Sequence, residues 1–191
     1  MDCTYNTTNQ HPLPRKLFLS DYITGSSVKE IVDQIIAINI EDDGKEETLK
    51  EYSRPPIFLY INSYGGSVYD GLALVDIIQE SVTPIVTIAV GACMSMGFWI
   101  WLSGGVRLIG KNATLMFHEI GMGINDKVHA IELEINELKR LQKLENRLIT
   151  STSNVTQEMI DSHIQSKDEW YISPKEAIKL KLAHEYYQRG I

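Results

Sequence analysis

Apolar positions near the start of the chain repeat at the spacing of one helical face. They are Val28, Ile31, Val32, Ile35 and Ile36. Their i, i+3, i+4, i+7 pattern predicts an amphipathic helix that covers a sheet, with Ser26 or Ser27 as its N-terminal cap. Residues 41–54 are highly charged and contain Gly44, which predicts an exposed loop between two elements.

Two short apolar runs follow, and each is too short to form a helix. They cover residues 57–61 and 85–90 and are rich in the residue types of buried parallel strands. Between them lies an apolar stripe at helical spacing, made of Val68, Leu72, Val75 and Ile78. A strand, a glycine turn, a helix and a second strand in this order predict a βαβ unit.

The second half of the chain continues this alternation. Residues 106–109 and 115–117 predict further strands, and residues 127–150 form the longest amphipathic stretch, a predicted long helix. Thr156 and Ser173 are expected to cap two short helices, and a last strand is expected within residues 183–187. The pattern predicts an α/β fold with a mostly parallel sheet.

Composition limits the function classes. A chain of 191 residues with 43% hydrophobic content fits one domain, and a net charge of −7 disfavours binding to a nucleic-acid backbone. Only Cys3 and Cys93 are present, too few for a disulfide framework, so we expect a cytoplasmic or other reducing intracellular setting. The longest apolar stretch, residues 85–102, reads as a strand and a buried helix, and we expect no membrane partner.

The glycine turn at residues 62–67 follows the first buried strand. Its sequence is NSYGGS, and its glycines can expose backbone N–H groups to a carbonyl oxygen or an anion. Taken alone, Gly65 and Gly66 are better explained as a tight strand-to-helix turn.

A serine occupies the corresponding place after the next buried strand. Residues 91–97 read GACMSMG and place Ser95 at the start of an apolar helix. The G-x-S-x-G pattern is absent, because Gly91 lies four residues before Ser95. A small serine that permits close packing is the simpler interpretation of Ser95 alone, and Cys93 reads as a core residue.

His118 stands at the end of the strand predicted at residues 115–117, where a general base would be well placed. A lone histidine there is more often structural. The ordered combination of glycine turn, serine and histidine is a stronger signal than each of its parts, because all three follow buried strands.

These motifs resemble the ClpP family of Clp protease proteolytic subunits. The resemblance is carried by IFLYINSYGGS at residues 57–67, MSMG at residues 94–97 and MFH at residues 116–118, and it extends over residues 16–187. It implies a crotonase-like fold, a repeated ββα-type spiral with a mostly parallel sheet and a protruding long-helix handle at about residues 119–150. Residues 1–15 would be a flexible N-terminal segment and residues 16–191 a single peptidase domain.

The resemblance also implies a catalytic assignment. Ser95 would attack the peptide carbonyl and His118 would take its proton. The N–H groups of Gly66 or Ser67 and of Met96 would form the oxyanion hole, and no metal or cofactor would be required.

Glu169 stands at the family's acid position when residues are counted back from SPKEA at residues 173–177, and Asp168 is the alternative acid. Other departures from the family pattern are Tyr64 in place of proline, Glu119 and Ile120 after the histidine, and Ala92 in place of glutamine.

The implied function is that of a serine endopeptidase subunit of a self-compartmentalised, ATP-dependent protease. It would act as a homo-oligomer of two stacked heptameric rings, a tetradecamer, on unfolded polypeptides supplied by an AAA+ unfoldase. Phe58 and Tyr60 resemble positions that dock this ATPase, although both also fit a buried strand. The alternatives are a structural ring subunit with little or no catalysis and an acyl-CoA enzyme on the related fold, which the context of Ser95 and His118 disfavours.

Overall fold

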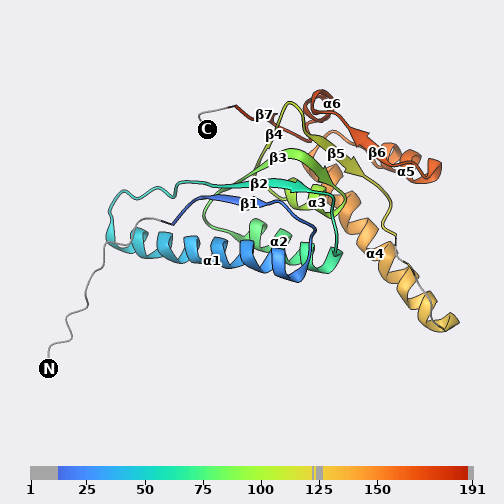
Figure 1. The fold of residues 1–191 in the computed structure, drawn as a ribbon, viewed down its shortest axis with the longest axis horizontal. Helices are drawn as coiled ribbons and strands as arrows, with labels where there is room; N and C mark the ends of the chain where they lie inside the picture. Colours follow the sequence, from blue (N-terminus) through green and yellow to red (C-terminus); the bar gives the residue numbers. More distant parts are fainter. Residues whose placement is uncertain (1–12, 122, 124–126, 189–191) are drawn as a thin grey trace.

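The computed structural model describes residues 13–121, 123 and 127–188 of the chain, and Figure 1 shows the order of its elements. The described strands are β1 (Lys16–Leu19), β2 (Ile57–Ser63), β3 (Ile85–Met94), β4 (Val106–Ile109), β5 (Thr114–Phe117), β6 (Trp170–Ile172) and β7 (Glu185–Tyr186). The described helices are α1 (Gly25–Thr48), α2 (Val68–Glu80), α3 (Met96–Leu102), α4 (Val128–Thr152), α5 (Gln157–Ser166) and α6 (Pro174–Lys179).

The strands form one mixed sheet in the order β1-β2-β3-β4-β7, and β5 pairs with the far end of β3 and with β6. All pairings between these strands are parallel except that of β5 with β6. Helices α1 and α2 lie together on one side of the sheet, and α4 projects away from the body (Figure 1). The predicted α/β class with a mostly parallel sheet is confirmed.

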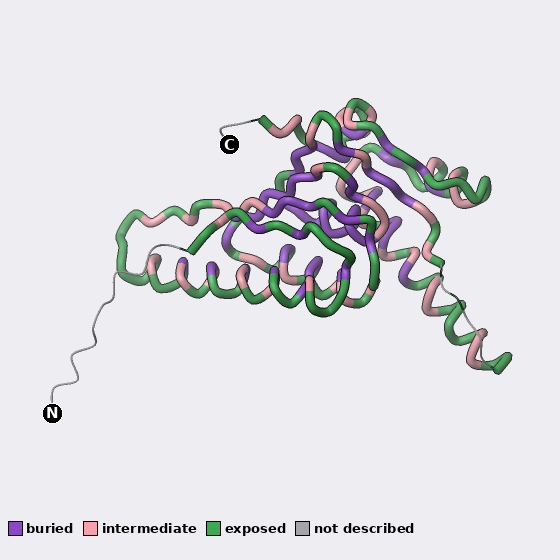
Figure 2. Tube along the Cα trace, viewed as in Figure 1, coloured by how far each residue is buried: buried purple, intermediate pink, exposed green. Residues whose placement is uncertain are grey.

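The βαβ unit β2-α2-β3 forms as the apolar runs predicted. Leu59, Ile61, Ile88 and Ala89 on its strands are fully buried, and so is Leu74 of the intervening helix. Figure 2 shows this buried region as a continuous centre of the fold. Because parallel strands all end at the same edge, the turns after β2 and β3 come to lie side by side.

Helix α1 begins earlier than predicted. Its N-cap is Thr24, whose side chain accepts a hydrogen bond from the Ser27 N–H at 3.3 Å, while the Ser27 hydroxyl accepts from the Thr24 N–H at 3.1 Å. This reciprocal capping box makes Ser27 the third helical residue, so the prediction of Ser26 or Ser27 as the cap is wrong.

The predicted loop at residues 41–54 is wrong in its first half, because α1 continues through Gly44 to Thr48. Asp42 is fully buried and accepts hydrogen bonds from Arg15, Tyr52 at 2.6 Å and Thr83 at 2.7 Å. Tertiary partners of this kind outweigh the weak preference of one glycine against a helix.

Charged side chains hold the remainder of this segment. Arg54 contacts Asp43 at 2.6 Å and Glu46, both on the last turns of α1. The segment that links α1 to β2 therefore folds back along the helix, with Arg54 paired to its last turns.

Strands β1 and β6 are present although their sequences did not predict them. Each is short, with only every second residue buried, as the two strands at the rim of a sheet often are. Cys93 is fully buried, as predicted for a core residue. Among the described residues, no helix combines the length and apolar character needed to cross a membrane.

Candidate active site

Ser95 is held in an unusual backbone conformation between β3 and α3. Its φ is 50° and its ψ is −125°, a region that residues with a Cβ rarely occupy. Hydrogen bonds fix this conformation, because the Ser95 N–H donates to the Met116 carbonyl at 2.9 Å and the Ser95 carbonyl accepts from the Phe98 N–H at 2.9 Å. Such strain costs on the order of 1–3 kcal/mol and persists where surrounding structure enforces it, often at functional sites.

His118 lies directly against Ser95. Its Nε2 atom is 2.9 Å from Ser95 Oγ, and both residues are partly exposed, so a substrate can reach them. The two side chains meet because β3 and β5 are parallel neighbours, with Met94 paired to Met116. The structure thus brings together the predicted serine and histidine at hydrogen-bonding distance.

The Nδ1 atom of His118 is 2.6 Å from the Glu119 carbonyl oxygen. A carbonyl oxygen only accepts hydrogen bonds, so this contact requires a proton on Nδ1. In the neutral ring, Nε2 is then free to accept the proton of the Ser95 hydroxyl, which is the tautomer that a general base needs.

The glycine turn packs against the serine. Gly65 has a φ of 103°, and a Cβ placed on it would lie 2.7 Å from Ser95 Cβ. Gly66 has a φ of 151°, and a Cβ there would lie 2.3 Å from the Ile23 carbonyl oxygen. Both positions therefore require glycine for steric reasons, in addition to their backbone conformation.

The backbone N–H groups of Gly66 and Ser67 in this turn point in different directions. The Ser67 N–H donates to the Ile23 carbonyl at 2.8 Å, which engages it away from the serine. Ile23 and Gly66 form a parallel bridge. The N–H of the bridged residue Gly66 points away from Ile23 in such a pairing. Among the predicted oxyanion donors of this turn, Gly66 is therefore better oriented than Ser67.

The side-chain nitrogens of His118 contact Ser95 and the Glu119 carbonyl, and neither predicted acid is hydrogen-bonded to them. Asp168 and Glu169 are exposed, and the Glu169 carboxylate accepts a hydrogen bond from the Tyr171 hydroxyl. Strand β6 pairs with β5 so that Trp170 faces Phe117. Extending this register by one residue sets Glu169 opposite His118.

A polar bridge made of Trp99, Glu145, Gln142 and the Ile120 N–H connects the segments that follow Ser95 and His118 through α4, and sequence reasoning missed it. Glu145 of α4 is fully buried and accepts hydrogen bonds from Trp99 Nε1 and from Gln142 Nε2, the latter at 3.1 Å. The Gln142 Oε1 atom accepts from the Ile120 N–H at 2.9 Å. Burial raises the pKa of Glu145 well above its usual range, only partly offset by the Gln142 hydrogen bond.

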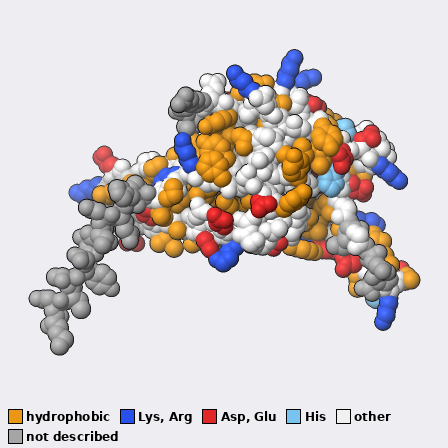
Figure 3. Space-filling model, viewed as in Figure 1, with side chains coloured by type: hydrophobic (Ala, Val, Ile, Leu, Met, Phe, Trp, Pro, Cys, Tyr) orange, Lys and Arg blue, Asp and Glu red, His pale blue; other side chains and the backbone are white. Residues whose placement is uncertain are grey.

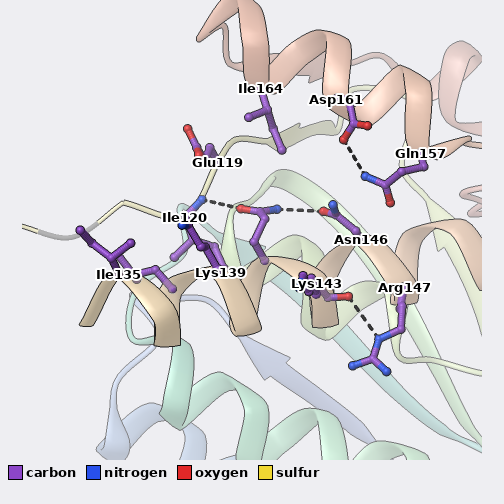
Figure 4. A pocket seen from close by; sticks show the side chains of 12 residues that line it. Glu119, Ile120, Ile135, Lys139, Lys143, Asn146, Arg147, Gln157, Asp161 and Ile164 are labelled. Carbon is purple, nitrogen blue, oxygen red and sulfur yellow. Dashed lines mark hydrogen bonds between the residues drawn. The ribbon is translucent and has the colours of Figure 1, made fainter. Parts of the chain in front are cut away.

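A cavity of about 880 Å³ opens beside this bridge, between α4, α5 and the segment that follows His118. Figure 4 shows Ile120, Ile135 and Ile164 at this cavity together with polar and charged side chains, among them Asn146 and Asp161. Glu119, the residue after His118, lines this cavity, whereas Ser95 and His118 do not. A cavity of this size and mixed lining can hold side chains of an extended peptide.

Comparison with known proteins identifies relatives of this chain. A family model for Clp protease matches residues 3–189. The ATP-dependent Clp protease proteolytic subunit 1 of a Synechococcus strain is 32% identical over 171 residues, which cover 88% of this chain and 80% of the relative. The subunit of the same name from Prochlorococcus marinus is 31% identical, with coverage of 88% and 81%.

A solved structure supports the fold. A variant of ClpP1 from Listeria monocytogenes superposes with a TM-score of 0.77 and covers 92% of each chain at 22% sequence identity. The family model spans nearly the whole chain, and relatives at 31–32% identity span most of it. The protein therefore belongs to the Clp protease family.

Proposed function

We propose that the protein is a serine endopeptidase subunit in which Ser95 is the nucleophile and His118 the general base. The observation that carries the proposal is the 2.9 Å contact between Ser95 Oγ and His118 Nε2. From the contact of Nδ1 with the Glu119 carbonyl, we infer that the ring proton is on the far nitrogen. His118 takes the hydroxyl proton as Ser95 attacks the peptide carbonyl, and then gives it to the departing amine.

The N–H groups of Gly66 and Met96 are the proposed oxyanion donors. Met96 is the first residue of α3, where the backbone N–H has no partner inside the helix. Gly66 belongs to the turn whose neighbouring residue Gly65 contacts Ser95. Two donors beside the nucleophile would stabilise the negative charge of the tetrahedral intermediate.

Glu169 is the proposed acid and Asp168 the alternative. The register of β5 and β6 supports Glu169, since it sets this residue across from His118. Its carboxylate is bound to Tyr171, so a change of side-chain rotamer would be needed to reach the histidine. The structural ring subunit is the alternative function, in which this acid contact is never made.

We further propose that the subunit acts in a homo-oligomer of two stacked heptameric rings that receives polypeptides from a Clp ATPase. The names of the relatives contain the words ATP-dependent and proteolytic subunit. Helix α4 supports assembly, because Val128 and Leu133 on its projecting half are 75% and 58% exposed. Figure 3 shows hydrophobic side chains along this projection.

An aromatic patch supports docking of a partner on another part of the surface. Tyr60 stacks on Phe18, with ring centroids 4.8 Å apart, and Phe18 remains 64% exposed. The Tyr60 hydroxyl also lies 3.1 Å from that of Tyr187. Tyr60 itself is 7% exposed, so Phe18 is the ring of this group that a partner can reach, and exposed aromatic groups are typical anchors at protein interfaces.

The proposal is tested by hydrolysis of a short fluorogenic peptide and by covalent labelling with a fluorophosphonate. Both are measured on the wild type and on Ser95→Ala, with assembly size determined on the same samples. We expect cleavage and labelling by the wild type alone, in particles of the mass of fourteen subunits. An assembled wild type that neither cleaves nor labels above Ser95→Ala would favour the structural subunit.

A further inference from the structure

One peptide unit of the chain is hydrogen-bonded at both of its ends. The peptide between Glu119 and Ile120 presents its carbonyl oxygen to His118 Nδ1 at 2.6 Å and its N–H to Gln142 Oε1 at 2.9 Å. Because a peptide is a rigid plane, its orientation controls both contacts together. The side chain of Gln142 is therefore linked to the catalytic histidine through a single planar group.

Gln142 is itself held in place by two neighbours on α4. Its Nε2 atom donates to Glu145 Oε2 at 3.1 Å and to Asn146 Oδ1 at 2.9 Å, and Figure 4 draws the hydrogen bonds that end at Ile120 and Asn146 as dashed lines. Glu145 and Asn146 are buried. Gln142 is half-buried and lines the cavity of about 880 Å³, so its hydrogen bonds to Ile120, Glu145 and Asn146 determine the orientation of its amide.

Glu145 also connects Gln142 to Ser95, through Trp99 of α3. Glu145 accepts a hydrogen bond from the indole Nε1 of Trp99, and the backbone N–H of Trp99 donates to the Ser95 carbonyl at 3.3 Å. Trp99 is 3% exposed and lies on α3, the helix that begins immediately after Ser95. These hydrogen bonds therefore form a closed ring of contacts, which connects Ser95 through α3, α4 and the peptide after His118 to His118 and back to Ser95.

We propose that Gln142 and Glu145 are positioning residues that hold His118 in its productive tautomer and orientation. Gln142 fixes the peptide between Glu119 and Ile120, and the carbonyl of that peptide keeps the proton on Nδ1. Glu145 ties Gln142 to the helix of the nucleophile through Trp99. Neither residue touches the substrate in this role, which rests on the proposed peptidase function.

The experiment compares three proteins with the wild type, all as full-length assembled chains. Gln142→Met removes the acceptor for the Ile120 N–H while keeping an unbranched side chain of similar length. The double variant Gln142→Glu with Glu145→Gln exchanges the two groups and keeps an acceptor for the N–H groups of both Ile120 and Trp99. Gln165→Met makes the same substitution as the first variant at an exposed position of α5.

We expect Gln142→Met to lower kcat about tenfold with little change in KM, the effect of losing roughly one hydrogen bond that aligns the base. The double variant should recover most of this loss, and Gln165→Met should match the wild type. If Gln142 only supported the fold, exchanging the two polar groups would not restore kcat. Wild-type kcat in Gln142→Met, or a double variant no better than the single one, would overturn the proposal.

A rise in KM at unchanged kcat would assign Gln142 to substrate binding in the adjoining cavity and would also overturn the positioning role. A crystal structure of Gln142→Met gives a readout that does not need activity. We expect the Glu119 carbonyl to turn away from His118 Nδ1 in it, and a retained contact would refute the proposal even if the wild type proved not to be a peptidase.

Discussion

Gly65 lies so close to Ser95 that a Cβ on residue 65 would approach the Ser95 Cβ to 2.7 Å. The glycine turn and the nucleophile are thus two parts of one packed unit, although they belong to different strands. Any side chain at residue 65 must move the serine, the turn or both.

We predict that Gly65→Ala lowers peptide hydrolysis at least tenfold and destabilises the fold by about 1–3 kcal/mol, because it adds both a clash and an unfavourable φ. Gly105→Ala is the matched control, since no atom lies within 4 Å of its added Cβ. Measurements of kcat and of unfolding in urea on both variants check this. Wild-type kcat in Gly65→Ala would show that the turn does not support the serine.

The identity of the acid is tested by two substitutions at neighbouring residues. Glu169→Ala should lower kcat roughly a hundredfold if, as we propose, its carboxylate turns from Tyr171 to His118 and stabilises the charged imidazole that forms during the reaction. Asp168→Ala should change kcat less than threefold, as expected of an exposed carboxylate that is not opposite His118 in the register of the strands. The reverse ranking of the two variants would make Asp168 the acid, and equal small effects would leave the histidine held by the Glu119 carbonyl alone.

Asp42 makes the fold sensitive to acid. Burial by itself would raise the pKa of this carboxyl, but hydrogen bonds from Arg15, Thr83 and Tyr52 outweigh it and hold the pKa well below its usual range. The stability from Asp42 is therefore complete above the pKa of the unfolded chain, about 3.9, and is lost as the pH falls below it.

We predict that Asp42→Asn lowers the free energy of unfolding at pH 7 by about 3 kcal/mol, because Arg15, whose side chain is 15% exposed, loses the charged and fully buried carboxylate that it contacts. The difference between the variant and the wild type should shrink as the pH is lowered from about 5 to about 3. Urea unfolding at several pH values measures this difference. A difference that stays constant with pH would show that the pKa of this carboxyl is the same in the folded and the unfolded protein, and would contradict the prediction.

Glu145 should have the opposite pH dependence. Burial raises the pKa of its carboxyl, and its hydrogen-bond partners, Trp99 and Gln142, carry no charge. The stability associated with the neutral carboxyl is present below the unfolded pKa, about 4.3, and is lost as the pH rises toward the folded value. As the pH rises above about 4.3, the free energy of unfolding of the wild type should therefore fall relative to that of Glu145→Gln, as urea unfolding would report.

A substitution at Gly44 tests whether α1 extends to this residue. It lies inside the helix, and a Cβ on it would meet no atom within 4 Å. Gly44→Ala should therefore stabilise the protein by about 0.5–1 kcal/mol, the usual gain from alanine over glycine within a helix. A loss of stability in thermal unfolding would contradict a helix at this position.

Much of the fold could be predicted from the sequence because its elements have strong local signals. The buried strands of the βαβ unit are continuous apolar runs, and α4 has a clear helical period. The end of α1 could not be predicted, because Asp42 is paired with Arg15, 27 residues away in sequence, and Asp43 and Glu46 are paired with Arg54, which follows the helix. Strands β1 and β6 are too short to show a period of their own.

The candidate site likewise contains residues that could be predicted from the sequence and residues that could not. Ser95 and His118 could be placed at one edge of the sheet from the order of the strands. Gln142 and Glu145 could not be identified, since polar residues on an amphipathic helix are normally exposed to solvent. The indole N–H of Trp99 was a usable signal, because a buried tryptophan needs an acceptor.

All buried residues of α4 lie in its second half, from Leu141 to Ile149. The first half consequently has few contacts within its own subunit, and an isolated helical segment of that length is marginal in water. In the proposed rings, its folding would be completed by neighbouring copies, which makes helix content depend on protein concentration. Dilution would then unwind this segment before the sheet is affected, so subunit concentration itself would determine how much of the helix is formed.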